Sequence, residues 1–151
     1  MMKNVLLITI TSVFMVGCGA MKQNMANYEA ERRAAEFQML DAKQKVEEIT
    51  CKGKEQCDLL FRIASDALIE TSDMKVQNNS LNYISTFNPT QPGRIGISAR
   101  KLLISGDTEK VIFSATCKDS YSSFEVLCNK GMYIVYTTYA NKLIDNGFKL
   151  K

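Results

Sequence analysis

The chain has 151 residues, enough for one modest domain with flanking segments. Its formal net charge of +3 is far below the strongly basic character expected of a nucleic-acid-binding protein. Histidine is absent, which removes the commonest general base and metal ligand, while an apolar fraction of 46% excludes a disordered chain. We therefore expect no nucleic-acid partner, no cofactor and no metal site.

The first residues have the order of an export signal. The basic residue Lys3 is followed by an uncharged, mostly apolar run at 5–16 and then by Gly17-Cys18. The twelve residues of the run would span about 18 Å as a helix, short of the roughly 30 Å core of a bilayer. A permanent membrane span is therefore the weaker interpretation. The remaining alternative is an ordinary signal peptide in which the cysteine has no special role.

The segment Met15-Val16-Gly17-Cys18 resembles the lipobox of bacterial lipoproteins, although the family usually has Leu where this chain has Met15. The resemblance implies a signal peptide at 1–17, cleavage before Cys18, a diacylglycerol on its sulfur and an amide-linked acyl chain such as palmitate. Gly19-Ala20 lacks the Asp that favours inner-membrane retention in the family, so the resemblance implies the periplasmic face of the outer membrane. Several acyl chains on one residue would hold the protein in a membrane without a second anchoring signal.

Residues 18–50 are predicted to form a lipidated tether, polar at 20–24, and then a charged spacer helix. The stretch 25–50 contains no Gly or Pro and has opposite charges four residues apart, which favours a helix. Its apolar repeat has coiled-coil spacing: Met25, Tyr28, Arg32, Ala35, Met39, Ala42, Val46 and Ile49. Because one of these positions is charged and two are alanine, we favour a single helix packed on its own domain through Val46 and Ile49.

Four cysteines remain besides Cys18, and an even number in an exported chain indicates two disulfides. Proximity favours Cys51–Cys57 and Cys117–Cys128 among the three pairings. Six residues of helix would rise about 9 Å, beyond disulfide reach, so the first cysteine must precede the helix that holds the second. The longer Cys117–Cys128 loop predicts the larger stabilisation. The alternative, a four-cysteine zinc site, lacks the usual Cys-x-x-Cys pairs.

Residues 51–151 are predicted to form a small α+β domain stapled by these disulfides. One helix begins near Glu55 and reaches Thr71, with an apolar stripe made of Cys57, Leu60, Phe61, Ala64 and Leu68. A C-terminal helix covers 130–148 and is expected to stop at Gly147. Its predicted buried face comprises Tyr133, Tyr136, Thr137, Ala140, Leu143 and Ile144.

Three strands are expected between these two helices. They cover 75–87 with a bulge at 78–80, then 94–100, then 111–117. A Pro-containing loop at 88–93 and a Gly-containing hairpin turn at 105–108 connect them. This order predicts a three-stranded antiparallel meander that carries both helices on one face.

No catalytic motif stands out in the sequence. The carboxylates of Asp66, Glu70 and Asp73 could act as an acid–base pair, but a solvated helix face explains their spacing better. Three tyrosines at helical spacing, Tyr133, Tyr136 and Tyr139, could line a ligand groove, but core packing is the simpler explanation.

Four basic residues, Arg94, Arg100, Lys101 and Lys110, are predicted to form a basic edge of the sheet that could meet an anionic glycan or a lipid headgroup. The alternative is that these charges protect an edge strand from pairing with another chain.

Together these features predict a membrane-anchored, non-enzymatic binding or accessory module of the cell envelope, with an envelope protein or peptidoglycan as partner. The alternative is an inhibitor of, or an enzyme acting on, cell-wall glycan. An inhibitor would use the loop between Cys117 and Cys128, which carries Tyr121 and Phe124. The sequence leaves the oligomeric state open.

Overall fold

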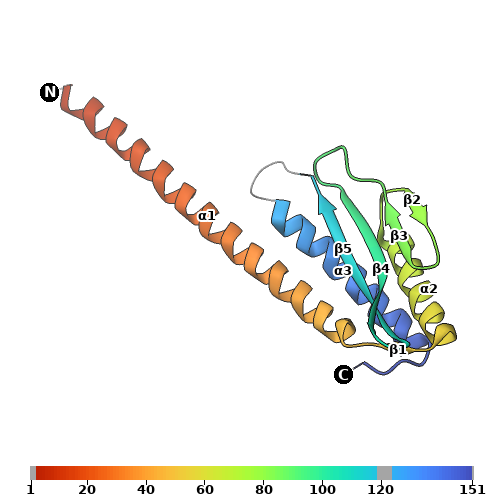
Figure 1. Cartoon of the computed structure of the whole chain (residues 1–151). Coiled ribbons are helices and arrows are strands. Elements are labelled where there is room, and N and C mark those ends of the chain that lie inside the picture. The colour runs from red at the N-terminus through yellow and green to blue at the C-terminus, as the bar shows by residue number, and fades with distance from the viewer. Residues whose placement is uncertain (1–2, 119–123, 151) are drawn as a thin grey trace. The chain divides into compact units, whose positions relative to one another are not determined.

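The computed structural model describes residues 3–118 and 124–150, with side chains described for 23–118 and 125–150. Figure 1 shows an α+β arrangement, which confirms the predicted fold class. The elements in chain order are α1 (Lys3–Glu47), β1 (Cys51–Lys52), α2 (Lys54–Thr71), β2 (Val76–Asn79), β3 (Tyr83–Thr86), β4 (Ile95–Ser105), β5 (Thr108–Cys117) and α3 (Phe124–Asp145).

Helix α1 is divided between two compact units of the chain. Residues 1–34 form the first unit, and the second unit comprises 35–151. The segment 20–24 was predicted to be a polar tether before the helix, but it is part of α1, because no Gly or Pro beyond Gly19 interrupts the helix there. Within the residues that the structure describes, no helix is both long enough and apolar enough to cross a bilayer.

The last turns of α1 belong to the second unit. Ala42 and Val46 are buried in its core, and Met39 and Ile49 pack against that core. The predicted packing through Val46 and Ile49 is confirmed, and it extends toward the N-terminus as far as Met39. The helix itself ends at Glu47, before the predicted residue 50.

The sheet has five antiparallel strands in the order β1-β5-β4-β3-β2 instead of the predicted three. The segment 75–87 folds into a hairpin, β2 and β3, because the chain reverses where a bulge was expected. The N–H of Ser80 donates to the carbonyl of Tyr83 over 2.8 Å and closes that turn. The predicted hairpin turn between β4 and β5 is confirmed, with a positive φ at Gly106.

Strand β1 leaves most of one edge of β5 without a neighbouring strand. Its two residues pair only with Thr108 and Glu109, at the start of β5. Beyond them, the side chains of Lys43, Val46 and Glu47 from α1 lie across a small cavity of about 200 Å³ from the segment 111–113 of β5. The end of α1 therefore flanks this edge of the sheet.

Helices α2 and α3 pack against each other and against the sheet. The core lies between these helices and the sheet. All five residues of the predicted stripe on α2 are buried, which confirms that face. The core also contains Ile84, Ile97, Ala99 and Val111 from three strands. Lys101 follows Ala99 on the same face of β4, because alternate side chains of a strand share a face.

Helix α3 begins at Phe124 and ends at Asp145, earlier at both ends than predicted. Its stop is as expected: Gly147 has a φ of 82°, and the N–H of Phe148 donates to the carbonyl of Leu143 over 2.9 Å. The predicted buried face is partly wrong, because Tyr133 is 37% and Ile144 55% exposed. Tyr136, Ala140 and Leu143 of the predicted face are buried. The other buried residues in the described part of α3 are Val126, Met132, Val135 and Tyr139.

Candidate functional site

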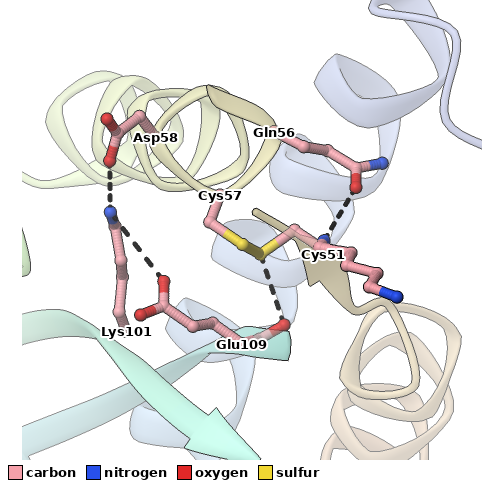
Figure 2. The surroundings of a disulfide bond; sticks show 7 residues. Cys51, Gln56, Cys57, Asp58, Lys101 and Glu109 are labelled. Atoms are coloured by element: carbon pink, nitrogen blue, oxygen red, sulfur yellow. Dashed lines mark hydrogen bonds and ion pairs between the residues drawn. A yellow bond between two sulfur atoms is a disulfide. The ribbon is translucent and has the colours of Figure 1, made fainter. Parts of the chain in front are cut away.

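The Cys51–Cys57 disulfide joins β1 to the first turn of α2 (Figure 2). Gly53 turns the chain between them with a φ of 76°, a conformation that costs a residue without a side chain little. The helix starts at Lys54 and so places Cys57 in its first turn, with a Cα–Cα separation of 5.0 Å from Cys51. The sequence predicted both the pairing and this local geometry.

Short contacts fix the disulfide to the β4–β5 hairpin. The N–H of Gly53 donates to the carbonyl of Asp107 over 2.9 Å, and the Sγ atom of Cys51 lies 3.3 Å from the carbonyl oxygen of Glu109. On the other side, the N–H of Lys52 donates to the Oε1 atom of Gln56 over 2.8 Å (Figure 2). The start of α2 is thereby held against the sheet at three points.

Beside the disulfide, Lys101 lies between two carboxylates (Figure 2). Its Nζ atom is 2.5 Å from Asp58 and 3.9 Å from Glu109, and its side chain is only 9% exposed. The same atom lies 5.8 Å from the ring centroid of Phe61, within range of a cation–π contact. Hydrogen bonds from Lys101 and then from Lys54 lower the pKa of Asp58 to about 2.

This cluster is suited to holding elements together rather than to catalysis. An ammonium group bonded to a carboxylate has no lone pair for nucleophilic attack. A carboxylate with so low a pKa is also a poor proton acceptor near neutral pH. The cluster therefore joins α2 to β4 and β5 by charge.

The Sγ atoms of Cys51 and Cys57 and a carboxylate oxygen of Glu109 lie within 4.8 Å of one another, close enough for metal ligands. The two sulfur atoms are bonded to each other, however, and a disulfide offers no thiolate to a metal.

The second disulfide joins Cys117, at the end of β5, to Cys128, in the early part of α3. This is the predicted pairing, and both cysteines are only partly buried. The residues 119–123 between them, and the side chain of Phe124, lie outside the described part of the chain. The two features that suggested an inhibitory loop were Tyr121 and the side chain of Phe124, and both therefore lie outside the described part of the chain.

The four basic residues predicted to form one edge are separated in the structure. Arg94 precedes β4 and bonds Asp73 over 2.6 Å, while Lys101 faces the helices beside Asp58. Arg100 and Lys110 occupy the opposite face, where the register places them diagonally across β4 and β5. Only these last two are neighbours on one face.

The other residues considered for a functional site lie in an ion pair, on the surface or in the core. Glu70 pairs with Lys142 over 2.7 Å, and Asp66 is exposed. Burial raises the pKa of Tyr139, and burial together with the charge of Glu47 raises that of Tyr136 to about 12. The rings of Tyr136 and Tyr139 meet Phe113 edge-on, with centroids 5.7 and 5.1 Å away. These two tyrosines form the core, as we favoured.

Cys18, the predicted lipidation site, lies in the part of α1 whose side chains are not described. Comparison with known proteins adds no family: no family model, no curated protein and no solved structure matches the chain.

Proposed function

We propose that the protein is a lipid-anchored lipoprotein of the bacterial cell envelope, in which the disulfide-stapled domain is a non-enzymatic binding or accessory module. The observation that carries this proposal is Gly17-Cys18 placed directly after the apolar run 5–16, where a lipoprotein signal peptide is cleaved. The two disulfides support it, because disulfides persist in oxidising compartments outside the cytoplasm.

A non-enzymatic role is supported by the surroundings of the reactive side chains. The chain has no histidine, and several of the charged groups singled out from the sequence pair with opposite charges. Lys101 is held by Asp58, Glu70 by Lys142, and Asp73 by Arg94. For the membrane, we propose the outer one, since the residues after Cys18 lack the Asp that favours inner-membrane retention in the family.

Mass spectrometry of the mature amino-terminal peptide tests the anchor. We expect a peptide that begins at Cys18 and carries a diacylglyceryl group and an amide-linked acyl chain. A Cys18→Ser variant should lose the modification, and the same mass spectrometry of its amino-terminal peptide should show this.

The matched control is Met15→Leu, which supplies the residue usual in the family and should leave processing unchanged. An unmodified peptide that begins at another residue would refute the lipoprotein proposal.

A further inference from the structure

A pocket of about 430 Å³ with both polar and apolar lining lies at one end of the sheet, away from the Lys101 cluster. Three segments build it: the link from α2 to β2, the end of β3, and the loop that leads to β4. The lining residues are Asp73, Met74, Lys75, Phe87, Asn88, Thr90, Gln91 and Arg94.

Several contacts hold these segments in place. The hydroxyl of Ser72 accepts the N–H of Met74 over 3.1 Å, just beyond the end of α2. The N–H of Phe87 donates to the carbonyl of Lys75 over 2.9 Å and joins the first two segments. The guanidinium of Arg94 then bonds Asp73 across the pocket wall over 2.6 Å.

The loop from β3 to β4 is tied down as well. Pro89 is buried, and the loop passes so close to Gly96 that a Cβ atom there would lie 3.0 Å from the carbonyl oxygen of Phe87. The Nζ atom of Lys118 donates to the carbonyl of Thr90 over 2.5 Å. A pocket whose walls are fixed before binding loses less entropy when a ligand enters.

The chemistry of the lining selects a class of ligand. The ring of Phe87, 48% exposed, offers an apolar face, as suits the C–H face of a sugar ring. The side-chain amides of Asn88 and Gln91 can both donate to and accept from an acetamido group. The Asp73–Arg94 pair adds a carboxylate, which can accept hydrogen bonds from hydroxyls, and a guanidinium, which can donate to them.

Other ligand classes fit less well. A phosphate would have to compete with the carboxylate of Asp73 for Arg94, and Lys75 is then the one remaining positive charge in the lining. A purely apolar ligand would leave the amides of Asn88 and Gln91 without hydrogen bonds. The balance of charges favours a neutral or singly negative polar ligand.

We propose that this pocket binds a glycan of N-acetylated amino sugars. The proposal deepens the envelope function above and rests on it for the place where the protein meets such a polymer. Phe87 stacks on a sugar ring, Asn88 and Gln91 bond acetamido groups, and Lys75 faces any carboxylate that the sugar carries.

Calorimetric titration with the trimer of N-acetylglucosamine tests the pocket. The full chain with Cys18→Ser, kept in mild detergent, is used so that the result does not depend on lipidation. We expect saturable binding of this trimer and much weaker binding of a glucose trimer, which lacks acetamido groups. Phe87→Ala should weaken binding by about tenfold, whereas Phe87→Tyr should preserve it.

The matched control is Tyr83→Ala, which removes an aromatic side chain of β3 that is 41% exposed and does not line the pocket. It should leave binding unchanged, and circular dichroism should show each variant folded. No binding, equal binding of the glucose trimer, or an equal loss in Tyr83→Ala would overturn the glycan proposal. Acylation of Cys18 is measured separately, so either proposal can fail while the other stands.

Discussion

The two disulfides close neighbouring segments of the chain but lie in different surroundings. Cys51 and Cys57 are 3% and 2% exposed and belong to the core, whereas Cys117 and Cys128 are only partly buried. Loop length favours the second disulfide, but only by about 0.5 kcal/mol in the chain-entropy model. Burial favours the first, because its loss also leaves a gap between β1, α2 and β5. Burial can therefore make the disulfide with the shorter loop the more stabilising of the two.

Replacing each disulfide by two alanines tests this reversal directly. We expect the Cys51→Ala/Cys57→Ala pair to lower the free energy of unfolding by about 3–5 kcal/mol, and the Cys117→Ala/Cys128→Ala pair by about 2–3 kcal/mol. Urea unfolding followed by circular dichroism measures both. Equal losses, or the larger loss at Cys117–Cys128, would restore the order that loop length predicts.

The contrast between the buried and the partly buried disulfide extends to two pairs of a cation and a carboxylate. Lys101 is nine-tenths buried beside Asp58, whereas Arg94 is half exposed beside Asp73. Lys101→Met should lower the free energy of unfolding by about 1–3 kcal/mol, since Glu109 and Asp58 lose a partner. Arg94→Met is the matched control and should cost about 0–1 kcal/mol. Equal costs would show that burial does not distinguish the two pairs.

The ion pair of Asp58 with Lys101 should also change how stability depends on pH in acid. The pKa of Asp58 falls from its ordinary 3.8 to about 2 in the folded state, so the unfolded state binds more protons between these values. The stability that Asp58 contributes is therefore complete above about pH 4 and is lost as the pH falls toward 2. Thermal unfolding from pH 2 to 6 should show a shallower decline in Asp58→Asn than in the unaltered chain. Parallel curves would contradict this role.

Local patterns in the sequence predicted the features that depend on neighbouring residues. The stripe on α2, the turn at Gly53, the hairpin turn at Gly106 and the stop at Gly147 all follow from spacing and turn chemistry. The buried face of α3 did not, because residues 132–136 are apolar or aromatic almost throughout and periodicity cannot select one side.

Features made by distant segments could not be predicted in this way. Strand β1 has two residues, too few to show any alternation. Lys101 and Asp58 are 43 residues apart, so only the packing of α2 on the sheet reveals the pair. The pocket beside Phe87 likewise brings Asp73 and Arg94 together across 21 residues, and no local pattern in the sequence predicts it. Each of the four basic residues was visible in the sequence, but its face on the sheet was not.

The end of α1 has a consequence for the solubility of the domain. Beyond Glu109, strand β5 presents an edge with the sequence Val111-Ile112-Phe113, and α1 flanks it with Val46. An uncovered apolar edge is a template for pairing with another chain and for growth into aggregates. Proteolytic cleavage of α1 between Ala35 and Val46 would loosen the turns of α1 that flank this edge. We therefore expect the cut chain to aggregate more readily than the intact chain, which light scattering would measure.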